Sequence, residues 1–187
     1  MNINNLPITI ENGAGEKLTF LRVYLKDGQE YVEVENEVQP GAGPPMHVHY
    51  EQDECMTVVK GKIGYQELGN EKKYAEAGAT ILFKAGIPHK FWNAGDSVLL
   101  CKGYATPVYN LVYFLSELFK STQANGKRPG IFDAAFLLNR YKSEFGMLEI
   151  PPFVQKRIFP IILLIGKIKG RYKKFKDAPF PLQLQKQ

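Results

Sequence analysis

The chain has 187 residues, of which 44% are hydrophobic and 23% are charged. This is enough apolar material for one solid core with an appendage, and it leaves too little for a second domain of similar size. No segment approaches the roughly 18 consecutive apolar residues of a membrane-spanning helix, and the first residues lack the charged and apolar regions of a secretory signal. We therefore expect a cytoplasmic protein.

The formal net charge of +5 is divided unevenly along the chain. Residues 1–104 hold 10 Lys and Arg against 14 Asp and Glu, whereas residues 105–187 hold 14 against 5. The first part is therefore acidic and the second part basic. Cys55 and Cys101 do not form a CxxC spacing, and we expect both thiols to be reduced and buried.

Two alternating segments near the start predict half-buried antiparallel strands, with Asp27-Gly28 as the turn between them. The residues that share one face of each segment are Thr19, Leu21, Val23 and Leu25, followed by Val32, Val34 and Val38. The glutamates on the other face of the second segment are typical of a solvated surface. Further short strands, separated by glycine turns, continue to about Tyr104 and indicate a closed or sandwiched all-β unit.

All three histidines of the protein lie near these glycine turns. His47 and His49 are two residues apart, so on a strand their rings point to the same side. Glu54 opens an apolar run that we expect to return as a strand beside the first, and His89 arrives on a later strand. A set of three imidazoles and a carboxylate suits a divalent Fe, Mn, Ni, Cu or Zn ion. We favour Fe or Mn, because four protein ligands leave open positions only on a five- or six-coordinate ion.

The spacing of these residues is specific. Gly41 is followed by His47, His49, Glu54 and Gly61, and the second pattern comprises Gly78, Gly86, His89 and Asn93. At these positions the chain resembles the cupin family, the RmlC-like cupin superfamily, over roughly residues 18–105. Lys84 stands where the family has proline, which removes a rigid turn but no ligand. The resemblance implies a mainly β fold, a single antiparallel β-barrel or double-stranded β-helix of the jelly-roll type, over residues 1–106.

Strand alternation also predicts which side chains surround the metal. If Glu54 points inward, so do Met56 and Val58, and His89 brings Phe91 and Asn93 with it. These four residues would line a largely apolar cavity for a small organic ligand. The alternative is that they only fill the interior of a small barrel.

From Pro107 the period changes to that of helices, and we expect about three α-helices in an extension over residues 107–177. Their predicted ranges are 107–123, 131–144 and 153–172, and residues 178–187 form a C-terminal arm. With this extension the chain resembles a group of uncharacterised bacterial single-domain cupins. The apolar stripes of the helices must be buried against each other, the barrel or a second subunit. A homodimer is therefore expected.

Basic residues crowd the basic helix segment 153–176, which contains the third helix, around a stripe of isoleucines. Such a helix can lie on an anionic membrane surface. We favour the simpler interpretation that the charges complement the helix dipole and keep a buried stripe soluble. No nucleic-acid-binding motif is present, and we expect no nucleic-acid partner.

The leading functional hypothesis is a metal-dependent enzyme acting on a small organic molecule. The resemblance admits dioxygenation, isomerisation and decarboxylation, and we place dioxygenation first. Glu54 could act as acid or base as well as ligand, and Glu33, Glu35 and Tyr24 are the candidates for an acid or base just outside the ligand set. The alternatives are a non-catalytic binding or sensing protein and a cupin in which the metal is purely structural.

Overall fold

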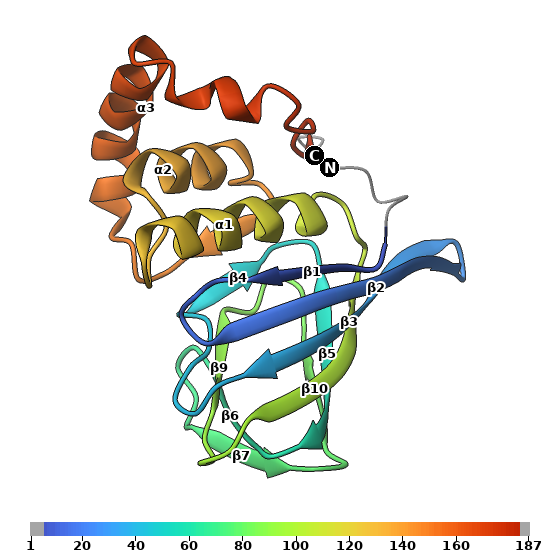
Figure 1. Cartoon of the computed structure of the whole chain (residues 1–187). Helices are drawn as coiled ribbons and strands as arrows, with labels where there is room; N and C mark the ends of the chain where they lie inside the picture. The colour runs from blue at the N-terminus through green and yellow to red at the C-terminus, as the bar shows by residue number, and fades with distance from the viewer. Residues whose placement is uncertain (1–5, 184–187) are drawn as a thin grey trace.

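The structure is a computed structural model that describes residues 6–183 (Figure 1). The strands are β1 (Ile8–Glu11), β2 (Glu16–Lys26), β3 (Gln29–Val38), β4 (His47–His49), β5 (Asp53–Lys60), β6 (Lys62–Glu67), β7 (Lys73–Glu76), β8 (Thr80–Phe83), β9 (His89–Asn93), β10 (Leu99–Thr106) and β11 (Phe145–Met147). The helices are α1 (Leu111–Asn125), α2 (Ile131–Arg140) and α3 (Phe159–Ile168), with a π-helical turn at Val154–Ile158 and a 3₁₀ helix at Arg171–Phe175. Among the described residues, no helix is both long and apolar enough to cross a bilayer.

Two antiparallel sheets form the barrel. The first has six strands in the order β1-β2-β3-β10-β5-β8, and the second has five in the order β11-β4-β9-β6-β7. Consecutive strands often lie in different sheets, which is the jelly-roll arrangement. The predicted mainly β fold with a C-terminal helical extension is confirmed, and Figure 1 shows the helices stacked over one end of the barrel with α1 closest to the strands.

The alternation predicted for the first long strand is only partly right. The register of β2 against β3 shifts between Phe20 and Arg22, so a bulge interrupts the strand. Leu18 and Phe20 are buried, whereas Leu25 is 70% exposed. The face predicted from Thr19 to Leu25 is therefore wrong before the bulge, where the opposite set of side chains points inward. On β3 the prediction is confirmed for Val32 and Val38, and the Asp27-Gly28 turn is also confirmed.

From the sequence we expect the strand that carries Glu54 to lie beside the histidine strand. This prediction is wrong. β5 pairs with β10 and β8 in the first sheet, whereas β4 pairs with β9 and β11 in the second. Gly61, with φ of 90°, is consequently the corner at which the chain passes from one sheet to the other, not a hairpin turn. Glu54 thus faces the histidines across the barrel.

The second helix ends at Arg140, earlier than predicted, because the chain then enters β11. This three-residue strand pairs with β4, so that Phe145 lies opposite His49 and Met147 opposite His47. Its Phe-Gly-Met sequence is too short to show alternation, which is why the sequence did not reveal it. Through β11 the helical extension is joined directly to the sheet that carries all three histidines.

The core has two parts. One lies between the sheets and contains Val38, Met56, Val58, Ile63, Ile81, Phe83, Phe91, Leu99 and the free, buried Cys101. The other lies between the first sheet and the helices, where Phe20 and Val32 pack against residues of α1 and α2. The predicted isoleucine stripe of α3 is not buried as expected: Ile162 is buried, but Ile161, Ile165 and Ile168 are exposed.

Glu144 holds the helical extension together. Its carboxylate is fully buried and accepts hydrogen bonds from Asn110 at the start of α1, 3.2 Å from the backbone N and 2.7 Å from Nδ2. It also accepts from the backbone N of Leu182, at 2.9 Å, and its own carbonyl accepts from Tyr50 N just after β4, at 2.8 Å. One residue therefore joins α1, the end of β4 and the described part of the arm predicted for residues 178–187; residues 184–187 lie outside the described residues.

We expect Glu144→Gln to lower the free energy of unfolding by about 2 kcal/mol, because the amide group would face buried N–H donors that need an acceptor. Chemical denaturation followed by circular dichroism measures this change. Glu71→Gln, at an exposed position between β6 and β7, is the matched control and should have little effect. Equal stabilities of the two variants would contradict the anchoring function of Glu144.

Candidate metal centre

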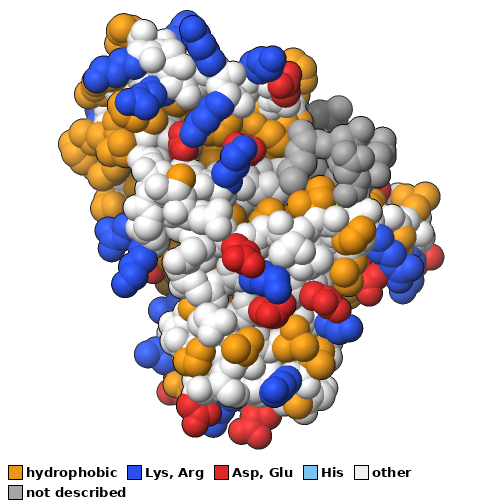
Figure 2. Space-filling model, in the orientation of Figure 1, with side chains coloured by type: hydrophobic (Ala, Val, Ile, Leu, Met, Phe, Trp, Pro, Cys, Tyr) orange, Lys and Arg blue, Asp and Glu red, His pale blue; other side chains and the backbone are white. Residues whose placement is uncertain are grey.

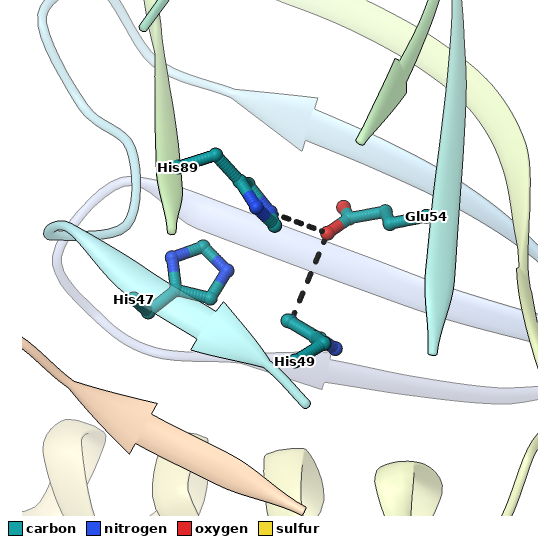
Figure 3. A group of neighbouring side chains, drawn as sticks. All are labelled: His47, His49, Glu54 and His89. Atoms are coloured by element: carbon teal, nitrogen blue, oxygen red, sulfur yellow. Dashed lines mark hydrogen bonds and ion pairs between the residues drawn. The ribbon is translucent and has the colours of Figure 1, made fainter. Parts of the chain in front are cut away.

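Four side chains from three strands meet inside the barrel (Figure 3). His47 and His49 project from β4, His89 from the neighbouring β9, and Glu54 from β5 in the opposite sheet. His47 and His89 are direct cross-strand partners. One potential ligand atom from each of the four residues lies within 4.8 Å of the others. The structure thus brings together the four residues predicted from the sequence as metal ligands.

Backbone carbonyls orient two of the rings. Nδ1 of His47 lies 2.9 Å from the carbonyl oxygen of Pro45, and Nδ1 of His89 lies 2.9 Å from that of Ile87. A carbonyl can only accept, so each Nδ1 carries a proton and Nε2 is the ring nitrogen left to face the cluster. This is the tautomer in which Nε2 can bind a metal ion, and the carbonyls act as the outer partners that fix the orientation of metal-binding imidazoles.

Glu54 lies between the imidazoles of His49 and His89. Its Oε2 is 3.3 Å from Nε2 of His89 and 3.8 Å from Nε2 of His49, as the dashed lines in Figure 3 show. Burial alone would raise the pKa of this carboxyl, but the hydrogen bond from His89 and the nearby imidazoles lower it to about 2. Burial lowers the pKa of His89, but the hydrogen bond and charge of Glu54 outweigh that effect and leave the His89 pKa above its ordinary value.

The other two histidines are held neutral. Burial, together with the charges of His49 and His89, lowers the pKa of His47 to about 3. Burial likewise lowers the pKa of His49. Neutral imidazoles and an ionised carboxylate are the protonation states that bind a metal ion, so the cluster does not need to lose several protons before binding.

Aromatic rings form the walls of the cluster. The ring of Phe83 stacks on His89 with centroids 4.1 Å apart, and Phe145 of β11 contacts His49 edge to face at 5.4 Å. His89 and His49 are almost completely buried, whereas His47 is partly exposed. A small molecule would therefore reach the cluster from the side of His47.

Gln52 is a neighbour of the cluster that the sequence did not single out. It is 1% exposed, its Nε2 donates to the carbonyl of Val108 at 3.4 Å, and its side chain approaches His49. Neither its Oε1 nor Nδ1 of His49 completes a hydrogen bond with a described residue. A glutamine before the carboxylate ligand gives no recognisable sequence signal.

Glu16 is the second residue that the sequence analysis missed. It lies on the same face of β2 as the buried Leu18 and Phe20, before the bulge, and its Oε2 accepts a hydrogen bond from Asn12 Nδ2 at 2.9 Å. Burial, only partly offset by Asn12, raises the pKa of Glu16 to about 7, and the charge of Glu54 adds to this effect. If the inward face of the strand had been assigned from Leu18 and Phe20, alternation would have predicted that Glu16 also points inward.

The candidates Glu33, Glu35 and Tyr24 are not brought to the cluster. Across the first sheet Glu33 is in register with Tyr104 and Cys55, whereas Glu54 is in register with Ala105, so the two carboxylates point to opposite faces. The outward contacts of the three candidates are an ion pair of Glu33 with Arg22 at 2.6 Å, one of Glu35 with Lys102 at 2.8 Å, and stacking of Tyr24 on Tyr31.

The four residues predicted to line a cavity are all fully buried. Met56, Val58 and Phe91 belong to the core between the sheets. Asn93 is committed to the backbone, because its Nδ2 donates to the carbonyls of Val38 and Ser97, both at 2.8 Å, and its Oδ1 accepts from Gly95 N at 2.9 Å. Its position shapes the loop after β9, and its polar atoms do not point to the cluster.

The comparison with known families agrees with this site. Residues 34–101 match the family model of the cupin domain, a segment that contains all four members of the cluster. The jelly-roll topology and the two histidine motifs agree with that match. The chain therefore contains a cupin domain, over residues 34–101.

Two curated fungal proteins are similar over more of the chain. "Probable oxidoreductase virH" of Hypocrea virens is 29% identical over 118 residues, which cover 60% of this chain and 53% of that protein. "Oxidoreductase iacF" of Pestalotiopsis fici is 27% identical over 134 residues, which cover 68% and 65%. The chain thus spans between about half and two thirds of the length of these relatives.

Two solved structures to which the chain is similar are more distant in sequence. KdgF from Halomonas sp. has 17% identity and a TM-score of 0.46, covering 60% of this chain and 96% of that one. A Klebsiella pneumoniae protein described as having a double-stranded beta-helix domain has 21% identity and a TM-score of 0.42, with 57% and 88% covered.

We expect Glu16→Gln to change the pH dependence of stability. A carboxyl group whose pKa rises to about 7 on folding stabilises the protein fully below its unfolded pKa, and this contribution is lost as the pH rises through the folded value. The amide keeps an acceptor for Asn12 but never ionises. In the metal-free protein, the variant should therefore gain stability relative to wild type between about pH 5 and about pH 8.

Urea denaturation of wild type and Glu16→Gln at the two pH values measures the difference between their free energies of unfolding. The same stability difference at both values would show that Glu16 does not become harder to ionise on folding.

Proposed function

We propose that this cupin is a metal-dependent enzyme that acts on a small organic molecule beside the histidine cluster. The observation that carries the proposal is the convergence of four ligand atoms within 4.8 Å, with Nδ1 of two imidazoles already committed to carbonyls. Dioxygenation comes first among the reactions, followed by isomerisation and decarboxylation. Fe or Mn is the favoured ion, with Zn, Ni or Cu as alternatives.

The donor set fits such an ion. Three imidazoles and one carboxylate supply four mixed nitrogen and oxygen ligands, and a five- or six-coordinate ion keeps at least one position for substrate. When bound, the ion would supply Lewis acidity or redox chemistry at that position. The chain itself would orient the ligands through the Pro45 and Ile87 carbonyls and admit substrate at the partly exposed His47.

Glu16 is the residue we propose for proton transfer, in place of the outward-facing Glu33, Glu35 and Tyr24. Its Oε2 is held by Asn12, and its Oε1 makes no hydrogen bond to the described residues. A carboxyl group with a pKa of about 7 is half protonated near neutral pH, which is the best condition for a group that both gives and takes a proton. Glu54, held ionised, would remain a ligand.

The names of the two curated relatives support redox chemistry, because both are called oxidoreductases. The identities are below one third and the chain spans only part of each relative, so the substrate and the reaction remain part of this proposal. The homodimer, the cytoplasmic location and the absence of a nucleic-acid partner also remain predictions.

A metal of structural function is the second candidate. The observation that favours it is that the ligands come from both sheets, so that a bound ion would clamp β5 against β4 and β9. A sensor that binds metal and metabolite without turnover would use the same residues. These alternatives predict metal binding without catalysis, which separates them from the enzyme.

We expect purified protein to bind one Fe or Mn ion per chain, and Glu54→Gln to weaken that affinity at least about tenfold. Glu35→Gln changes a carboxylate on the outer face of the same sheet and is the matched control, so it should bind metal as wild type does. Elemental analysis and competitive chelator titration give the two affinities. Equal affinities for all three proteins would place the metal elsewhere and end the proposed site.

For catalysis, we expect the Fe-loaded protein to consume oxygen with at least one member of a panel of diketones, catechols and flavonoids. Chelation of the metal should abolish the rate, and Glu16→Gln should lower kcat and remove the limb of the pH profile that corresponds to a pKa near 7. An oxygen electrode and product analysis measure both effects. Metal binding without turnover across the panel and the alternative metals would favour the structural or sensing function.

A further inference from the structure

Two opposite faces of α3 are apolar, and only one of them is covered. Phe159, Ile162 and Gly166 are buried against the rest of the molecule. The residues of the other face, here called the α3 apolar face, are Phe153, Ile161, Leu164, Ile165 and Ile168. The last four follow the spacing i, i+3, i+4 and i+7, which aligns them on one side of a helix. Ile168 is 77% exposed and Leu164 60% exposed.

A helix that is apolar all round is normally buried all round. Single exposed leucines are common on protein surfaces, but four large apolar side chains aligned on one side of a helix form a patch of the kind that marks an interaction site. Figure 2 shows hydrophobic side chains gathered at the left edge of the molecule, where Figure 1 places α3.

Cations flank this face on both sides. Lys156, Arg157, Lys167 and Lys169 are exposed, and none of them forms an ion pair with another described residue. No acidic residue occurs between residues 150 and 176. Lysine and arginine next to the apolar edge also appear in Figure 2. The face therefore combines an apolar centre with a purely cationic border.

We propose that the α3 apolar face docks on an anionic lipid surface, with the helix lying in the plane of the interface. The apolar side chains would enter the boundary between headgroups and acyl chains, and the long cationic side chains would reach lipid phosphates. Anionic lipids attract such a border of lysine and arginine by roughly 1 kcal/mol for each residue near the surface. The ten residues of α3 are far too few to span the bilayer, so contact is peripheral.

A second copy of the chain fits this face less well. A two-fold dimer places the same patch of both subunits together, so each cationic border would meet its own copy, and the segment 150–176 offers no acidic residue to compensate. An anionic surface removes this repulsion. The charge pattern thus selects lipid over self-association.

The test uses the full chain and vesicles of phosphatidylcholine alone or mixed with equal parts of phosphatidylglycerol. We expect cosedimentation with the mixed vesicles at low salt, and loss of binding at high salt or without the anionic lipid. Leu164→Glu should lower the partition coefficient at least about tenfold, and Lys167→Gln with Lys169→Gln should lower it by a similar factor on anionic vesicles.

Leu68→Glu is the matched control, because Leu68 is 58% exposed in the turn between β6 and β7 and should leave binding unchanged. Circular dichroism confirms that each variant is folded. Failure of wild type to sediment at low salt would overturn the proposal, as would binding that Leu164→Glu leaves intact. So would light scattering that shows a dimer broken by Leu164→Glu in a protein that ignores vesicles, since a second copy would then occupy the face.

Discussion

The structure depends on bringing a carboxylate and three imidazoles out of water to a single point. An isolated buried carboxylate is costly, and Glu54 remains ionised only because the imidazoles face it from the opposite sheet. The imidazoles in turn need partners for their nitrogen atoms, which the carbonyls of Pro45 and Ile87 supply in part. The Nε2 atoms that remain define the place where a cation would be stabilised most.

The interior of the barrel contains two carboxyl groups in contrasting environments. The imidazoles that face Glu54 give its carboxyl a low pKa, whereas desolvation by burial gives the carboxyl of Glu16 a high pKa. Pairs of titratable groups whose environments separate their pKa values are a recurring arrangement in enzymes that need a permanent charge and an exchangeable proton in the same cavity. This contrast is the basis on which Glu16 is proposed for proton transfer and Glu54 for metal binding.

The spacing of the sequence predicted the four clustered residues, because a local rule places His47 and His49 on one side of a strand and the resemblance to the cupin motifs adds Glu54 and His89. Two residues apart on a strand means the same side, and glycines at fixed distances mark the corners of a jelly roll. Features that depend on distant pairing were not predictable in this way. The bulge after Phe20 reversed the phase of β2 and hid Glu16, and the sheet to which β5 belongs cannot be read from its own residues.

The helical extension shows the same limit. Periodicity identified the helices, but it could not decide which side of α3 the rest of the protein covers, because both sides are apolar. Ile162 is buried, and its neighbour Ile161 is not. Hydrophobic spacing tells where a helix could be buried, and only the packed structure tells where it is.

The pairing of β11 with β4 shows that the walls of the site include residues beyond the segment that matches the cupin domain. The family match stops at residue 101, yet the strand that carries His47 and His49 has as its outer neighbour a segment more than forty residues further along the chain. A chain cut after the last barrel strand would leave β4 with bare N–H and C=O groups beside two histidines, open to pairing with other chains. The segment beyond the matched cupin domain is therefore part of the wall of the site.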